Sequence, residues 1–166
     1  MIDVPTAGGT YVLILKAAST RRVRIGSLGL LDLRPGYYAY VGSAFGPGGL
    51  RARISHHQHR SAKPHWHIDY LRRATCLVDI FFREYEHAEH AWATAIAALP
   101  ESTIVLPRFG SSDCSCATHL YRFEAYDPAT GATINGCVVG AADPASGSTV
   151  TATAPVAPTS TGPGNT

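Results

Sequence analysis

Residues 34–59 read RPGYYAYVGSAFGPGGLRARISHHQH, and this stretch decides the fold. The Pro-Gly pair near its start marks a tight turn, and the aromatic run Tyr37–Val41 predicts a strand. Residues 46–49 consist of Gly and Pro only and predict a loop. Leu50 and Ile54 lie four residues apart with arginines between them, which predicts a helix to about His59 with one apolar stripe. The stretch therefore reads as strand, loop and helix.

The elements predicted on either side complete a small α+β domain. Apolar and β-branched runs predict strands at 10–15, 22–25, 76–82, 103–106 and 119–123. Residues 68–71 predict a second helical piece, and the Ala-rich segment 86–99 predicts a helix that ends at Pro100. The order of the elements predicts a mixed, mainly antiparallel sheet flanked by helices. The globular domain is expected at residues 5–126.

Composition limits the class of protein further. The chain has 166 residues, 45 % hydrophobic and 16 % charged, which excludes a highly charged disordered chain and a coiled coil. No apolar run reaches membrane-spanning length, and the N-terminus lacks a secretory signal pattern, so we expect a cytoplasmic protein without a membrane partner. Residues 127–166 are rich in Ala, Thr, Ser, Pro and Gly and predict a disordered low-complexity tail, with one edge strand within 127–139 as an alternative.

The basic residues gather in one segment. All 14 Lys and Arg residues precede residue 127, and two of the 12 acids follow residue 126, so residues 1–126 carry a net charge of +4 and all eight histidines. Between Arg51 and Arg73, Asp69 is the single acid among six basic residues and five histidines. This imbalance favours an anionic partner, and an ordinary solvated helix face is the alternative.

Three separated blocks carry a resemblance to a known family. Tyr40-Val-Gly-Ser-Ala44, followed by a short loop and by Leu50-Arg-Ala-Arg53, resembles the second half of the GIY-YIG nuclease signature, and Gly9-Thr-Tyr11 resembles the first half. The segments His65–Leu71 and Phe109–Leu120 resemble the Uri-type branch of that superfamily. Thr10 stands where the signature has Ile, and the long Lys16–Pro35 spacer implies an inserted hairpin.

The resemblance implies roles for named residues. Tyr11 and His57 would serve as the general base, Arg53 would bind phosphate, Tyr40 would be the second tyrosine, and one glutamate would hold a divalent Mg²⁺ or Mn²⁺. We expect Glu89 to be that metal ligand, because it leads the Ala-rich helix, and Glu86 is the alternative, with a solvated first-turn acid as its ordinary role. An arginine fork also suits a phosphate better than a lysine does. Further contacts to the substrate are expected from Arg51, Arg60, Lys63, His65 and His67.

The cysteines and two histidine motifs suggest other chemistry. In a reducing compartment Cys76, Cys114, Cys116 and Cys137 are expected to be free thiols or metal ligands. Cys114, Cys116 and His119 could bind zinc, with a fourth ligand from His65, His67 or Cys76. The alternatives are buried thiols beside a capped turn at 111–113, or a catalytic Cys114. The His65-x-His67-x-Asp69 pattern resembles a metallo-β-lactamase motif, but Tyr70 stands where that motif has a histidine. Local hydrogen bonding by His65 and His67 is therefore favoured over metal binding.

These observations lead to one hypothesis and two alternatives. The hypothesis is a metal-dependent endonuclease that hydrolyses DNA phosphodiester bonds in repair or processing, with RNA as another substrate to test. Specificity would come from DNA structure, a partner protein or a homodimer, because no sequence-reading module is recognisable. The alternatives are an inactive nucleic-acid-binding module and a zinc protein that uses the Cys114, Cys116 and His119 cluster.

Overall fold

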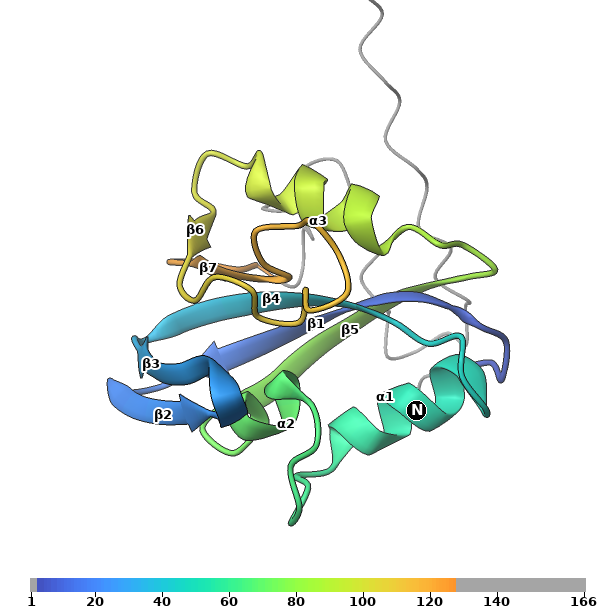
Figure 1. Cartoon of the computed structure of the whole chain (residues 1–166), viewed down its shortest axis with the longest axis horizontal. Coiled ribbons are helices and arrows are strands. Elements are labelled where there is room, and N and C mark those ends of the chain that lie inside the picture. The colour runs from blue at the N-terminus through green and yellow to red at the C-terminus, as the bar shows by residue number, and fades with distance from the viewer. Residues whose placement is uncertain (1–2, 128–166) are drawn as a thin grey trace, which may run out of the picture.

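The computed structural model describes residues 3–127, and the predictions for the tail beyond residue 127 lie outside this range. A five-stranded sheet forms the middle layer, with strand order β5-β1-β4-β7-β6 (Figure 1). Each pairing is antiparallel, which confirms the predicted α+β class. The strands are β1 (Gly9–Ala17), β4 (Gly36–Ser43), β5 (Cys76–Glu84), β6 (Thr103–Ile104) and β7 (Leu120–Phe123).

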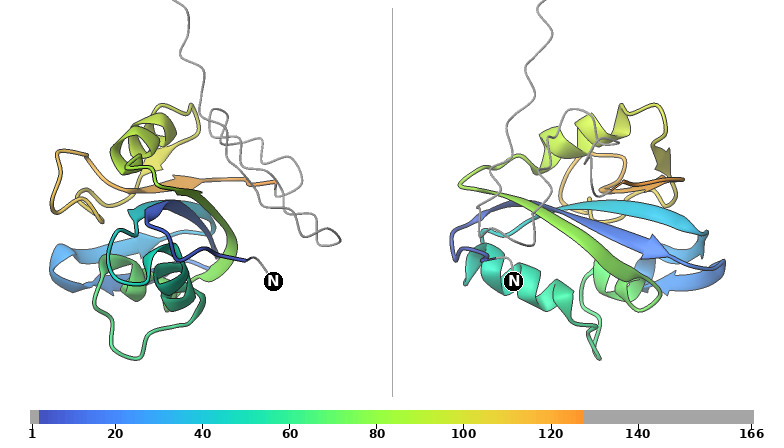
Figure 2. Two further views of the ribbon diagram at one scale, coloured as in Figure 1. Left: turned by 90° about the vertical axis from the view of Figure 1, so that its right-hand side faces the viewer. Right: turned by 180° about the vertical axis from the view of Figure 1, so that it is seen from behind.

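Helices cover both faces of this sheet. α1 (Gly49–Gln58) and α2 (His67–Arg72) lie on one face, and α3 (Glu89–Ala97) lies on the other, as the views in Figure 2 also show. The predicted inserted hairpin is present as β2 (Arg21–Ile25) and β3 (Gly29–Leu33), joined by the 3-10 turn η1 (Gly26–Leu28). It forms a separate two-stranded sheet whose strand β2 contacts α2. No helix within residues 3–127 has both the length and the apolar character to cross a bilayer.

The alternation of side chains along β1 and β4 produces two cores. Tyr11, Leu13 and Leu15 point to the α1 and α2 side, together with Leu50 and Ile54 of α1. Val12 and Ile14 of β1 point to the α3 side, where they pack with Trp92 and Ile96. Because both faces are covered, β1 is apolar in almost every position rather than alternating with polar residues.

Two element boundaries differ from the sequence prediction for identifiable reasons. The helix predicted from residue 86 begins at Glu89, because Thr10 Oγ1 donates to the Glu86 carbonyl and accepts from the Ala88 amide, which holds this turn outside the helix. The strand predicted at 103–106 is only two residues long, because Val105 and Leu106 turn inward to pack on the α1-side core. In both cases a tertiary contact overrides the local pattern.

Candidate active site

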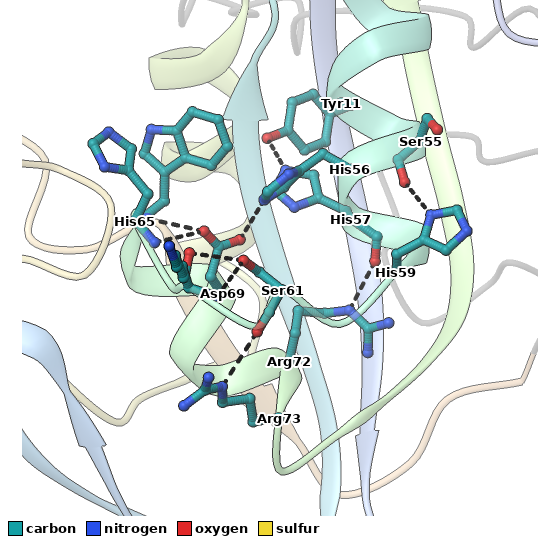
Figure 3. Close-up of polar contacts among 12 residues, drawn as sticks. Tyr11, Ser55, His56, His57, His59, Ser61, His65, Asp69, Arg72 and Arg73 are labelled. Atoms are coloured by element: carbon teal, nitrogen blue, oxygen red, sulfur yellow. Dashed lines mark hydrogen bonds and ion pairs between the residues drawn. The ribbon is translucent and has the colours of Figure 1, made fainter.

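The two halves of the signature, Gly9–Tyr11 and Tyr40–Ala44, lie next to each other on the paired strands β1 and β4. Tyr11 of β1 lies opposite Gly42 of β4, and the buried Tyr11 hydroxyl lies 2.8 Å from Nε2 of the buried His57 on α1 (Figure 3). A Cβ atom at Gly42 would lie 2.5 Å from the Tyr11 hydroxyl oxygen. Glycine is therefore required at this position so that the phenol can cross its partner strand and reach the helix.

The protonation states of this pair follow from burial. Burial is the main cause that raises the pKa of Tyr11 well above 10.0, and the neighbouring Tyr40 adds to it. Burial, followed by the nearby His56, lowers the pKa of His57 to about 3. At neutral pH the phenol is therefore protonated and the imidazole is neutral, so the Tyr11 hydroxyl donates to His57 Nε2. The other ring nitrogen, Nδ1, is buried and has no hydrogen-bond partner within residues 3–127.

Arg53 brings an unneutralised positive charge to the same place. It lies four residues before His57 on α1, and its guanidinium carbon is 4.1 Å from the centre of the Trp66 ring. Its charge acts on Tyr11, Tyr40 and His57, which shows that it lies within electrostatic range of all three. No carboxylate of residues 3–127 forms an ion pair with Arg53. The guanidinium charge of Arg53 is therefore not neutralised by a carboxylate of the described residues.

Tyr40 forms the second aromatic wall of the site. Its ring centre lies 6.4 Å from that of Tyr11 and 5.9 Å from that of Phe109, which it meets edge to face. Burial, followed by the charge of Glu89, raises the pKa of Tyr40 well above its ordinary value. Gly110 makes room for this ring, because a Cβ atom there would lie 2.9 Å from it.

Glu89 approaches the two tyrosines from the other helix layer. It is the first residue of α3, and its negative charge raises the pKa of both Tyr11 and Tyr40. Its Oε1 lies 3.2 Å from Nδ1 of His119. Burial alone would raise the pKa of Glu89, but the contacts with His119 and Ser43 outweigh burial and lower it. An ionised carboxylate is thus held near the phenols.

Glu86, the alternative metal ligand, is placed differently. It lies before α3 rather than in its first turn, which corrects the expected helix-dipole role. Its carboxylate forms an ion pair of 3.0 Å with Arg83. Of the two glutamates, Glu89 is the one whose charge acts on both tyrosines.

The predicted substrate-binding arginines and lysine are distributed over the α1 and α2 layer. Arg51 is exposed, donates to the Val4 carbonyl at 2.7 Å and pairs with Asp3, so its guanidinium anchors the N-terminal segment. Arg60 is exposed near the Thr75 carbonyl, and Lys63 is exposed in the loop before α2. Arg60 and Lys63 remain open to solvent with no ion pair within residues 3–127.

The His65–Asp69 segment forms a local hydrogen-bonded turn. The buried Asp69 carboxylate accepts from the backbone amides of His65 and Trp66, both at 3.0 Å, and from His56 Nε2 at 2.8 Å (Figure 3). His56, His57 and Asp69 lie close enough to share an ion, but these contacts already occupy the carboxylate. His67 accepts from the Gly110 amide at 3.2 Å, and burial lowers its pKa. The segment therefore positions Trp66 under Arg53.

A second cluster contains sulfur and imidazole groups. His90 of α3 lies with Cys114, Cys116 and His119 of the loop before β7, and one ligand atom of each lies within 4.8 Å of the others. Cys76, Cys114 and Cys116 are free thiols. The sequence predicted Cys114, Cys116 and His119 as members of this cluster. It predicted the fourth member wrongly, because the fourth residue is His90 rather than His65, His67 or Cys76. Cys76 instead lies on the surface beside Arg60.

The comparison with known families agrees with the extent of this domain. The family model described as "Domain of unknown function DUF123" matches residues 10–137. The chain belongs to this family. No curated protein and no solved structure matches the chain.

The matched range of this DUF123 domain contains every candidate residue described above, from Tyr11 to His119. Sequence reasoning missed His90 and Ser43. Ser43 of β4 meets Glu89 where α3 packs against β4, and His90 of α3 meets Cys116 of the loop before β7. Trp66 was also not among the predicted site residues, although its ring lies against the Arg53 guanidinium. His90 follows Glu89 directly, and that adjacency was the one available signal.

Proposed function

We propose that this DUF123 protein is a divalent-metal-dependent endonuclease that hydrolyses DNA phosphodiester bonds, and that its domain is a GIY-YIG domain of the Uri type. The observation that carries the proposal is the 2.8 Å contact between Tyr11 and a neutral His57, beside an Arg53 that has no carboxylate partner within residues 3–127. A proton acceptor and a phosphate-binding cation at one site are what phosphodiester hydrolysis needs.

The proposed role of Tyr11 and His57 is to take a proton from the attacking water. As the water oxygen bonds to phosphorus, its proton passes to the Tyr11 oxygen and the Tyr11 proton passes to His57 Nε2. The bond from phosphorus to the leaving oxygen breaks, and that oxygen takes a proton from solvent. Burial lowers the pKa of His57, so Nε2 carries no proton at neutral pH. The negative charge of a bound phosphate would raise the pKa of His57 toward the neutral range in which a general base works best.

The proposed role of Arg53 is to hold the phosphate. Its planar fork can bind two phosphate oxygens, and it stays charged at any physiological pH. Stacking on Trp66 fixes its orientation before the substrate arrives, so less ordering is needed on binding. The pentavalent transition state carries more negative charge than the substrate, and a preorganised cation stabilises it preferentially.

Glu89 is the residue proposed to hold Mg²⁺ or Mn²⁺. Mg²⁺ is commonly bound by one or two carboxylates together with substrate phosphates and water. Glu89 fits this requirement, because it is ionised and partly exposed, and the contacts with His119 and Ser43 leave further acceptor capacity on its two oxygens. When bound, the metal would stabilise charge on the leaving oxygen.

The remaining basic groups support a nucleic-acid backbone as the substrate. Arg60 and Lys63 lie exposed near the helix that presents Arg53. Phosphate contacts of this type position a protein on DNA without reading its sequence. The substrate is therefore expected to be chosen by DNA structure or by a partner.

The test is cleavage of supercoiled plasmid, branched DNA and single-stranded RNA by the full chain, with Mg²⁺, Mn²⁺ or a chelator. We expect metal-dependent cutting that Arg53→Ala and Glu89→Ala each reduce by about 10²-fold or more. Arg24→Ala on the β2–β3 hairpin and Glu101→Ala after α3 are matched exposed controls, and both should keep wild-type activity. Circular dichroism spectra and melting curves confirm that each variant is folded.

The alternative outcomes decide against specific parts of the proposal. Salt-dependent DNA binding without cleavage under either metal would favour the inactive binding module. Cleavage that survives Glu89→Ala but not Arg53→Ala would move the metal ligand away from Glu89. Cleavage confined to single-stranded RNA would change the substrate class.

A further inference from the structure

We propose that His90, Cys114, Cys116 and His119 form a tetrahedral zinc site that ties the loop before β7 to helix α3. One ligand atom of each residue lies within 4.8 Å of the other three. This inference is independent of the proposed nuclease activity.

The spacing of the ligand atoms agrees with a single central ion. His90 Nδ1 lies 3.3 Å from Cys116 Sγ, and His119 Nε2 lies 3.4 Å from Cys114 Sγ. Tetrahedral Zn²⁺ with bonds of about 2.3 Å to sulfur and about 2.0 Å to nitrogen separates a sulfur from a nitrogen ligand by roughly 3.5 Å. These two pairs therefore have the separation that a tetrahedral ion would impose, and all four ligand atoms lie within 4.8 Å of one another.

The ligand set favours zinc over other ions. Two thiolates and two imidazoles in tetrahedral positions are the donor set of structural zinc sites, and they give a neutral centre with Zn²⁺. Magnesium and calcium prefer oxygen ligands, so the ion at this cluster is distinct from the one proposed at Glu89.

His119 has a carboxylate near its other ring nitrogen. Its Nδ1 lies 3.2 Å from Glu89 Oε1, outside hydrogen-bond geometry, while its Nε2 faces Cys114. Metal-bound histidines commonly donate from the nitrogen that does not bind the metal to such a carboxylate. Glu89 is therefore placed to become the outer partner of the cluster when the ion binds.

The cluster would cross-link a part of the chain that has no regular secondary structure. Residues 105–119 contain no helix or strand. Backbone hydrogen bonds within this loop include Arg108 N to Ala117 O at 2.7 Å and His119 N to Phe109 O at 2.8 Å. A zinc ion would add to these bonds and would connect the loop to the first turn of α3, because metal binding contributes to the free energy of folding.

The test begins with the full chain purified without a polyhistidine tag, and measures zinc, iron, copper and nickel by mass spectrometry. We expect about one zinc per chain. Replacing both cluster cysteines, Cys114→Ser with Cys116→Ser, should reduce zinc to less than a tenth of that value. Cys76→Ser removes the exposed cysteine outside the cluster and should leave the zinc content unchanged.

A second measurement keeps the proposal testable where the double variant does not fold. Co²⁺ titrated into the chelator-treated wild-type chain should give thiolate charge-transfer absorption and the intense visible bands of tetrahedral cobalt, which Zn²⁺ then displaces. His90→Ala should weaken zinc binding by more than the roughly 10- to 100-fold that loss of an outer partner costs, while His59→Ala on the surface of the molecule should leave zinc binding unchanged. A metal-free chain that binds neither ion, octahedral cobalt spectra, or another metal at one equivalent would overturn the proposal.

Discussion

Two groups of residues lie on either side of Glu89. The first, the tyrosine site, contains Tyr11, Tyr40, Arg53 and His57, and the second, the sulfur–imidazole cluster, contains His90, Cys114, Cys116 and His119. The two differ in how the chain assembles them. Tyr11, Gly42 and His57 come together through the register of β1 against β4 and through the last turn of α1, the helix that follows β4 in the chain. The four residues of the cluster come together only when α3 and the loop before β7 pack on the same face of the sheet. Strand pairing and the helix that follows β4 therefore fix the first site, whereas the packing of a loop against α3 fixes the second.

The largest expected effect is on the first site. Tyr11→Phe keeps the buried ring but removes the hydroxyl that donates to His57, so cleavage should fall by about 10²- to 10⁴-fold with little change in melting temperature. Tyr37→Phe on β4 is the matched control, because the Tyr37 side chain packs against Tyr126 rather than in the site. Single-turnover rates measure the effect, and equal rates for the two variants would remove Tyr11 from the reaction.

Removing zinc from the sulfur–imidazole cluster should have a smaller effect than Tyr11→Phe, and the effect should be on the stability of the fold. A ligand that binds only the folded chain stabilises it by about 2.7 kcal/mol when its free concentration is 100 times its dissociation constant. Chelation should therefore lower the melting temperature of the wild-type chain, and added zinc should restore it. The chain with Cys114→Ser and Cys116→Ser should not respond to either treatment. A wild-type melting curve that ignores both chelator and zinc would contradict the cross-link.

A glycine substitution tests how the two halves of the signature fit together. Gly42→Ala places a methyl group against the Tyr11 hydroxyl, which should destabilise the fold by about 1–3 kcal/mol and displace the phenol from His57. Gly46→Ala in the following loop meets no atom within 4 Å and serves as the control. Chemical denaturation gives both values, and equal stability would show that the Tyr11 hydroxyl does not cross β4 at Gly42.

The buried imidazole predicts a pH dependence of stability. Below its ordinary pKa of 6.5, His57 binds a proton in the unfolded chain, but in the folded chain it stays neutral until about pH 3. Acid therefore favours the unfolded state, and the free energy of unfolding should fall by about 1.4 kcal/mol per pH unit in this window from His57 alone. The variant His57→Gln does not titrate at this position and should show a shallower slope. Identical slopes from about pH 6.5 to pH 5 would place the protonation elsewhere.

The smallest expected effect concerns the exposed basic groups. Lys63→Ala should change stability by less than about 0.5 kcal/mol, because Lys63 is exposed and forms no ion pair within residues 3–127. It should reduce the slope of log affinity for DNA against log salt by about 1 if Lys63 contacts a phosphate. An unchanged slope would remove Lys63 from the DNA interface.

The difference between the two sites also explains which elements and which site residues could be predicted from the sequence. The strands and α1 were predictable because their apolar periodicity is local, and the inserted hairpin followed from the length of the Lys16–Pro35 spacer. The start of α3 was not predictable, because Thr10, distant in the sequence, holds the preceding turn. His90 was missed for the same physical reason, since no spacing rule connects it to Cys114. Local patterns predicted the elements, the family resemblance supplied the candidate residues of the first site, and long-range packing completed the cluster.

The most direct test of the central claim is the single-turnover cleavage of supercoiled plasmid by the full wild-type chain with Mg²⁺, compared with Tyr11→Phe and Arg53→Ala at equal concentration. The account predicts nicking that needs Mg²⁺ or Mn²⁺ and that each substitution reduces by at least about 10²-fold in a folded protein. Wild-type protein that binds DNA but cuts neither plasmid nor branched DNA with either metal would contradict the account.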